Sequence, residues 1–159
     1  MISSTANSRV KHVVQLREKG RERKKEGVFL AEGIRMFQET PVGRIRELYM
    51  EETLAERPQT EDFSEKIEAC RQAGIFVETV SSEVMKKMAD TMSPQGVLVV
   101  AEMFAYQPEE LIREAVKRRE QEGRDPLFLL LEDVQDPGNL GTMIRTAAVS
   151  YTHLRAHET

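Results

Sequence analysis

Apolar positions in the first two thirds of the chain alternate between two spacings, which predict helices and strands in turn. Within residues 8–19, Val10, Val13 and Val14 recur at the three- and four-residue spacing of an amphipathic helix. Three further helices are predicted from Gly33 onward, from Thr60 to Gly74, and from Ser81 or Ser82 to Met88. Short apolar runs predict buried strands at 28–31, 45–50, 75–80 and 97–103. This alternation predicts a small α/β sandwich over residues 1–104.

The pattern changes after residue 104. A polar helix with a thin apolar stripe is predicted to begin near Pro108 and to end at Gly123. We interpret residues 105–125 as a helical linker between two domains, with an exposed helix of the first domain as the alternative. Residues 127–131 form an uninterrupted apolar run, which is typical of a strand covered on both faces. A turn at 136–138 and a helix over 139–148 follow, and its apolar side chains, at 140, 143, 144 and 147, are expected to face inward.

Charge is distributed unevenly along the 159 residues, of which 40% are hydrophobic and 31% charged, as in a folded globular protein. The net charge is -4, yet residues 1–25 hold eight basic and two acidic side chains. This excess predicts a local site for a polyanion, with nucleic acid as one candidate. The alternative is a solvated helix face followed by a basic loop at 21–25, after a helix stop at Gly20.

Other classes of protein are disfavoured by the composition. No apolar run reaches the length of a membrane-spanning helix, and the first residues lack the layout of a secretory signal. Cys70 is the only cysteine, which excludes an intrachain disulfide and a cysteine-rich zinc site, and we expect it in the core. The three histidines show no metal-ligand spacing. We therefore expect neither a membrane nor a metal as partner, and we expect a cytoplasmic location.

The segment from Leu129 to Ala147 predicts a strand, a sharp turn and a helix that together could form a ligand site. Asn139 in the turn and Arg145 further along the helix could both point to the edge of the sheet where open α/β folds bind ligands. Gly138 and Gly141 would allow a phosphate or a backbone to approach closely. The alternative is that Asn139 caps the helix, the glycines shape the turn, and Arg145 is a surface charge.

The residues Asp136-Pro-Gly-Asn-Leu-Gly141, followed by Ile144-Arg-Thr-Ala147, closely resemble the first motif of the SpoU (TrmH-like) RNA ribose 2'-O-methyltransferases of the knotted SPOUT class. Residues 1–104 are similar to the substrate-binding domain of that family, which has an L30e-like fold. The matching features there are Ile2-Ser3-Ser4 with Asn7 and Lys11, Phe29 to Gly33 with Arg35, and Pro94 to Val97. The resemblance covers residues 2–148.

The resemblance implies a division of labour between two domains. The L30e-like sandwich of residues 1–104 would bind RNA, with ribosomal RNA as the expected substrate. Residues 126–148 would be the first strand–helix unit of a SPOUT domain, which binds S-adenosylmethionine and methylates a ribose 2'-hydroxyl. The implied catalytic residues are Asn139 and Arg145, the latter as a positioning group, since a guanidinium is a poor base. The expected RNA-binding residues are Asn7, Lys11, Arg21, Arg23, Lys24, Glu32, Arg35 and Gln95.

The match to the family ends at residue 148. Members of the family carry two later motifs that build the knot and most of the methyl-donor pocket, and neither motif occurs here. We therefore expect a C-terminally truncated form that binds RNA but does not bind S-adenosylmethionine or turn over, with residues 149–159 as a tail foreign to the family. Family members form homodimers through the knotted domain, which makes a homodimer doubtful here.

Two alternatives stay open. One is a stand-alone L30e-like RNA-binding module without catalysis. The other is an unrelated nucleotide-binding α/β protein in which the Asp136–Asn139 turn cradles a phosphate.

Overall fold

The computed structural model describes residues 1–57, 60–104, 107–123 and 125–150. The chain divides into two compact units, Met1–Phe104 (unit 1) and Ala105–Thr159 (unit 2), and each is described by itself. The tail expected at 149–159 lies outside the described residues from position 151 onward. No helix of the described residues is long and apolar enough to cross a membrane.

Unit 1 is built on a mixed four-stranded sheet. Its strands are β1 (Val28–Glu32), β2 (Ile45–Glu51), β3 (Phe76–Val80) and β4 (Val97–Glu102), in the order β1-β4-β2-β3. Strands β1 and β2 each run antiparallel to β4, whereas β3 runs parallel to β2. Strands β1, β2 and β3 therefore point the same way, and their C-terminal ends lie at the edge of the sheet where β4 begins.

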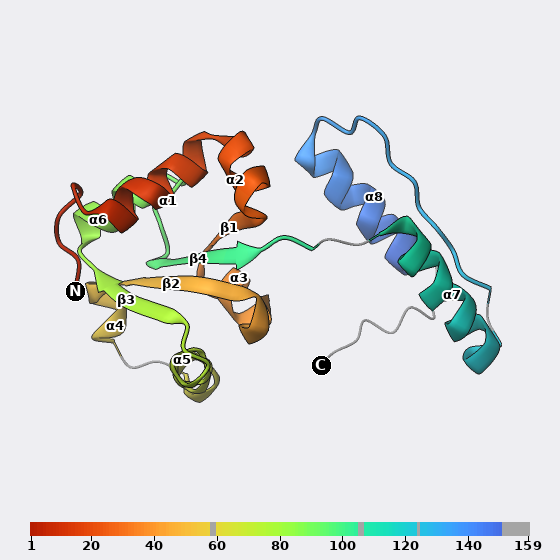
Figure 1. The fold of residues 1–159 in the computed structure, drawn as a ribbon, viewed down its shortest axis with the longest axis horizontal. Helices are drawn as coiled ribbons and strands as arrows, with labels where there is room; N and C mark the ends of the chain where they lie inside the picture. The colour runs from red at the N-terminus through yellow and green to blue at the C-terminus, as the bar shows by residue number, and fades with distance from the viewer. Residues whose placement is uncertain (58–59, 105–106, 124, 151–159) are drawn as a thin grey trace. The chain divides into compact units, whose positions relative to one another are not determined.

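Helices cover both faces of this sheet, as Figure 1 shows. On one face lie α1 (Ser8–Glu18), α2 (Gly20–Glu26) and α6 (Ser82–Met88), and on the other lie α3 (Ile34–Glu39), α4 (Glu52–Ala55) and α5 (Glu61–Gln72). A short 3-10 turn, η1 (Val42–Arg44), precedes β2. The α/β sandwich predicted for residues 1–104 is confirmed.

Each face of the sheet carries its own apolar core. The first core joins α1 and α6 to the sheet through Val10, Val13, Leu16, Val84, Met85, Met88, Tyr49, Leu98 and Val100. The second joins α3, α4 and α5 to the opposite face through Phe37, Leu54, Phe63, Ile67, Cys70, Leu48, Met50 and Val99. Cys70 is buried in this core, as predicted.

The predicted basic loop at 21–25 is wrong, because these residues belong to α2. The first helix ends at Glu18, close to the stop predicted at Gly20, but the bend falls at Lys19, whose backbone is extended, and a second helix begins directly after it at Gly20. Gly27 ends that helix with a left-handed φ of 66°. Charged side chains with long stems tolerate a helix well, so a run of Lys, Arg and Glu does not by itself indicate a loop. The short helix α4 was not predicted.

Unit 2 contains two described helices, α7 (Pro108–Glu122) and α8 (Pro137–Ser150). Proline in the first turn and Gly123 after the last residue bound α7 as expected. The strand predicted at 127–131 is wrong: these residues are in no strand and are exposed, Leu130 by 89%. The apolar residues of α8 that were expected to face inward are also exposed, Ile144 by 55%, except for half-buried Ala147. A strand needs a hydrogen-bonded neighbour, and the described part of unit 2 supplies none.

Candidate functional site

The excess of positive charge near the N-terminus folds into α1 and α2, and its side chains fall into two groups. We call residues 9–25 the basic segment; its cations are Arg9, Lys11, Arg17, Lys19, Arg21, Arg23, Lys24 and Lys25. One group is engaged within the fold, and the other is exposed. We expect the first group to stabilise the fold and the second to bind a ligand, because a cation that is already paired within the protein interacts less strongly with an added anion.

Arg17 and Arg23 belong to the engaged group. Arg23 Nη1 donates to the carbonyl oxygens of Leu16 and Arg17 at 2.6 and 2.8 Å, which fixes α2 against the C-terminal end of α1. Arg17 Nη1 donates to the carbonyl oxygens of Lys87 and Ala89 at 2.9 and 3.0 Å. These carbonyls at helix ends lack partners within their own helices, so the two arginines satisfy groups that would otherwise be orphaned.

Arg9 is engaged as well, and it anchors the start of α1 to the sheet. Its Nη1 lies 3.0 Å from Glu47 Oε1, and its guanidinium stacks 3.8 Å from the centre of the Phe76 ring. The buried Tyr49 hydroxyl donates to Glu47 Oε2 at 2.6 Å. Burial, helped by this hydrogen bond, raises the pKa of Tyr49 far above its ordinary value, so the phenol stays a donor. Asn7 Oδ1 accepts from the amide of Arg9 at 2.9 Å and thereby caps α1.

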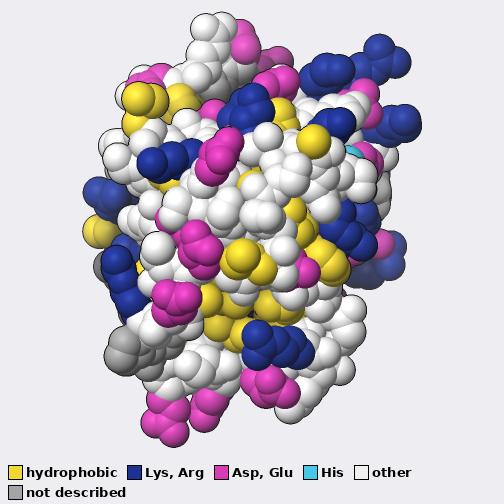
Figure 2. Space-filling model, turned by 90° about the vertical axis from the view of Figure 1, so that its left-hand side faces the viewer, with side chains coloured by type: hydrophobic (Ala, Val, Ile, Leu, Met, Phe, Trp, Pro, Cys, Tyr) yellow, Lys and Arg dark blue, Asp and Glu magenta, His cyan; other side chains and the backbone are white. Residues whose placement is uncertain are grey.

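The exposed group can bind an anion. Lys11, Lys19, Arg21, Lys24 and Lys25 are exposed and have no ion pair within the described part of the chain. Two of the nearby acids are occupied, since Glu18 pairs with Arg17 at 2.9 Å and Glu26 lies 2.9 Å from the His12 imidazole. Figure 2 shows Lys and Arg side chains standing out from the surface at its upper right.

A second group of predicted residues lies where β1 passes into α3, and it holds a loop in place. Glu32 accepts from the amides of Asp90 and Thr91 at 3.0 and 3.3 Å and also from the Thr91 hydroxyl. Gln95 Oε1 accepts from the amide of Ile34 at 3.3 Å. Arg35 is paired with Glu39 at 2.8 Å, and this pairing raises the pKa of Arg35. The Glu32 carboxylate and the Gln95 Oε1 atom thus have partners within the fold.

The structure therefore sorts the predicted RNA-binding residues by what they touch. Lys11, Arg21 and Lys24 are exposed and unpaired within the described residues. The remaining five have partners within the protein, namely Asn7, Arg23, Glu32, Arg35 and Gln95. Lys19 and Lys25 are likewise exposed and unpaired within the described residues. They are absent from the family motifs, so only their position in the charge run indicated that they could bind RNA.

The turn before α8 agrees only in part with the sequence interpretations: Arg145 is exposed, as the surface-charge alternative expects, but the helix cap is a different residue. Asp136, and not Asn139, caps the helix: its carboxylate accepts from the amides of Gly138 and Asn139 at 3.0 and 3.3 Å. In this structure the Asp136 carboxylate occupies these amides, and they are not free to cradle a phosphate as the nucleotide-binding alternative requires. Asn139 and Arg145 are both exposed on α8, and six residues place them about 120° apart around the helix and about 9 Å apart along it. The structure does not bring these two side chains together.

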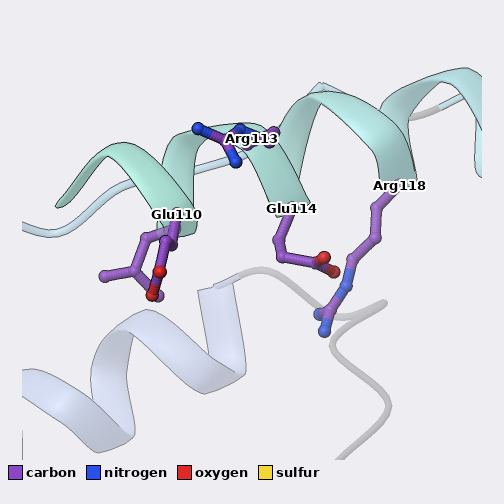
Figure 3. A pocket seen from close by; sticks show the side chains of 5 residues that line it. Glu110, Arg113, Glu114 and Arg118 are labelled. Carbon is purple, nitrogen blue, oxygen red and sulfur yellow. The ribbon is translucent and has the colours of Figure 1, made fainter. Parts of the chain in front are cut away.

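The described residues of unit 2 do not fit a bound S-adenosylmethionine. A ligand pocket buries most of the ligand's surface, whereas Asn139, Arg145 and the apolar run at 127–131 are all exposed. A shallow hollow does lie on α7, lined by Glu110, Leu111, Arg113, Glu114 and Arg118 (Figure 3). All five belong to one exposed helix, and their charges alternate in sign. Within the described residues, no cluster of His, Cys, Asp and Glu could hold a metal ion.

Comparison with known proteins identifies relatives of the chain. Residues 7–99 match the family described as the MRM3-like substrate binding domain. The 23S rRNA (guanosine(2553)-2'-O)-methyltransferase RlmP of Bacillus subtilis is 32% identical over 148 residues, which are 92% of this chain and 49% of RlmP. An uncharacterized tRNA/rRNA methyltransferase of Synechocystis is 31% identical, over 94% of this chain and 49% of its own length. The chain thus spans about half the length of these curated relatives.

Solved structures agree with these relatives. The AdoMet-bound rRNA methyltransferase from Sinorhizobium meliloti superposes with a TM-score of 0.59 and 25% identity, over 94% of this chain and 50% of that one. An RNA 2'-O ribose methyltransferase shares the fold with a TM-score of 0.57 at 23% identity, over 94% of this chain and 52% of the other. The family predicted from the motifs is confirmed. The chain belongs to the family of the MRM3-like substrate-binding domain and, with it, to the SpoU (TrmH-like) RNA methyltransferases.

Proposed function

We propose that unit 1 binds RNA through the exposed cations of the basic segment and delivers it to a ribose 2'-O-methyltransferase reaction that uses S-adenosylmethionine. Ribosomal RNA is the proposed substrate class, because RlmP is named for 23S rRNA and a human relative is named rRNA methyltransferase 3, mitochondrial. The observation that carries the proposal is a set of five exposed cations on α1, α2 and the residue between them, which have no ion pair among the residues that the structure describes.

The proposed division of the chain follows from the sequence motifs. Residues 1–104 form the RNA-binding domain, residues 105–125 connect it, and residues 126–148 begin the methyltransferase domain. In the complete enzyme, we assign Asn139 to shaping the reaction site and Arg145 to holding the ribose hydroxyl and a neighbouring phosphate. Arg145 acts by binding, because a guanidinium stays protonated at neutral pH. For the 159-residue chain itself, we propose RNA binding without methyl transfer, since Asn139 and Arg145 stay exposed and lie on different sides of α8.

The first test removes three proposed phosphate contacts. The variant Lys11→Gln/Arg21→Gln/Lys24→Gln should bind a 23S rRNA fragment more weakly than the parent chain. Each phosphate contact contributes about 0.7–0.9 to the slope of log K against log salt concentration. Fluorescence anisotropy across a salt series should therefore show the slope reduced by about two to three.

The control loses the same number of charges elsewhere. Arg71→Gln/Arg113→Gln/Lys117→Gln also removes three exposed cations, but none of them lies on α1 or α2. Its affinity and salt slope should match those of the parent. Equal weakening by both variants would show a nonspecific effect of net charge and would contradict the proposed site.

The catalytic reading is preferred to a stand-alone RNA-binding module because the curated relatives described above are all named as methyltransferases. Both predict RNA binding by this chain. A longer chain that carries the two later family motifs distinguishes the two hypotheses. If the catalytic hypothesis is correct, that chain should bind S-adenosylmethionine and transfer a labelled methyl group to ribose.

A further inference from the structure

We propose that the RNA-binding surface continues from the basic segment onto the C-terminal end of α6, where Lys86 and Lys87 contact RNA phosphates. This inference rests on the proposed RNA binding by α1 and α2. It adds two residues from a part of the chain about sixty positions away, which neither the family motifs nor the charge run of residues 1–25 include.

Arg17 joins the two parts of this surface. Its guanidinium reaches from the last turn of α1 to the carbonyl oxygens of Lys87 and Ala89. Arg23 brings α2 to the same end of α1 through the carbonyl oxygen of Arg17 itself. The C-terminal ends of α1 and α6 and the body of α2 therefore meet around residue 17. The end of α6 that carries Lys86 and Lys87 is thus tied to the end of α1.

Lys86 and Lys87 are available for a ligand. Both are exposed, and neither has an ion pair within the residues that the structure describes. Cations at a helix C-terminus commonly bind the last carbonyl groups, but here Arg17 already occupies two of them. The acidic residue of α6, Glu83, lies in its first turn, at the opposite end of the helix.

The two helical layers of unit 1 also differ in charge. Helices α1, α2 and α6 carry nine basic and four acidic side chains, whereas α3, α4 and α5 carry three basic and six acidic ones. An RNA backbone would therefore be attracted to one layer and repelled by the other.

The chemistry of the positive layer indicates a folded RNA. Helices α1, α2 and α6 contain no Phe, Tyr or Trp on which unstacked bases could stack. We therefore expect phosphate and ribose contacts to dominate binding, and such contacts read the shape of a structured RNA. We therefore assign this layer to the backbone of a double-helical element.

The test compares two variants with two charges removed. Lys86→Gln/Lys87→Gln should lower the salt slope for a 23S rRNA hairpin by about one to two, whereas the control Arg71→Gln/Arg113→Gln should leave it unchanged. Far-ultraviolet circular dichroism and thermal unfolding should be the same for both variants. The parent should also bind the hairpin more tightly than an oligouridylate of equal length, and equal affinities would overturn the assignment to a folded RNA.

A double-mutant cycle tests the role of Arg17 as a positioning residue. In an Arg17→Met background, the loss caused by Lys86→Gln/Lys87→Gln should shrink, because the C-terminal end of α6 loses the two hydrogen bonds that tie it to α1, while the shared apolar core keeps the two helices packed. If Lys11→Gln/Arg21→Gln/Lys24→Gln weakens binding and the α6 variant does not, the inference is overturned while the proposed function stands. If neither weakens binding, the proposed function itself fails, and this inference fails with it.

Discussion

Gly33 is the residue at which β1 passes into α3, and its environment admits no side chain without strain. Its φ of 105° lies in the region that favours glycine, and a Cβ there would lie 2.8 Å from Gln95 Oε1. Gln95 can move, since the crowded atom is the end of a flexible side chain, but the backbone angle cannot change without moving the strand. The strained backbone angle should therefore account for more of the destabilisation caused by a side chain at position 33 than crowding against Gln95 does.

We predict that Gly33→Ala lowers the free energy of unfolding by about 1–3 kcal/mol. The control is Gly43→Ala, because a Cβ at Gly43 meets nothing within 4 Å and its φ is ordinary; it should change stability by less than about 0.5 kcal/mol. Urea denaturation measures both. Adding Gln95→Ala should recover only the smaller part of the loss, and full recovery would show that crowding, not the backbone angle, sets the cost.

Residue type alone could not separate the cations that hold the fold from those available to a ligand. Arg21 and Arg23 belong to the same charge run, yet Arg21 is exposed and Arg23 binds two carbonyl oxygens of α1. The difference arises from the bend at Lys19, which turns α2 back toward the end of α1. Gly20 indicated a break near this position, but the sequence did not show that a second helix follows or which way it turns, so sequence reasoning grouped the two arginines together.

At the scale of elements, α2 depends on α1 because it buries no residue of its own. A seven-residue helix is too short to be stable alone, so its hydrogen bonds to a neighbour decide whether it forms. Arg23 makes the two side-chain hydrogen bonds that join it to α1.

We predict that Arg23→Met lowers the free energy of unfolding by about 1–3 kcal/mol and speeds amide exchange across α2, because two carbonyl groups lose their donor. Arg21→Met, two residues away, should leave stability within about 0.5 kcal/mol and instead weaken RNA binding. Hydrogen exchange and anisotropy measured on both variants check this. If both variants behave alike, the distinction between engaged and exposed arginines is wrong.

The strand predicted at 127–131 is wrong for a reason that also concerns the packing of elements. Periodicity correctly indicated the four strands and the helices α1, α3, α5 and α6 of unit 1, because each one packs on a sheet that unit 1 itself supplies. The run at 127–131 has the composition of a buried strand, but a strand is defined by its neighbours. The described residues of unit 2 offer none, and its apolar side chains remain exposed.

At the scale of the whole molecule, the two units should differ in stability and in tendency to associate. Unit 1 buries two apolar cores, whereas unit 2 exposes Leu127, Phe128, Leu129 and Leu130 by at least half. Contiguous exposed apolar surface of this kind promotes association.

We predict that residues 1–104 alone unfold cooperatively and stay monomeric, while the full chain associates as its concentration rises. Sedimentation velocity over a concentration series measures this difference. Phe128→Glu/Leu130→Glu in the full chain should reduce the association, because it places charges on the exposed run. A full chain that stays monomeric, with amides 127–148 strongly protected from exchange, would contradict the prediction.

Basic side chains predominate on one face of the sheet of unit 1 and acidic side chains on the other, so the net charge does not describe what a ligand meets on either face. The layers on opposite faces of the sheet have axes about 20 Å apart, since an element packs at roughly 10 Å from a sheet. At physiological ionic strength, the Debye length is only about 8 Å. A phosphate lying against α1, α2 and α6 is therefore screened from the acids on α4 and α5, and a chain of net charge -4 presents itself to RNA as a cation.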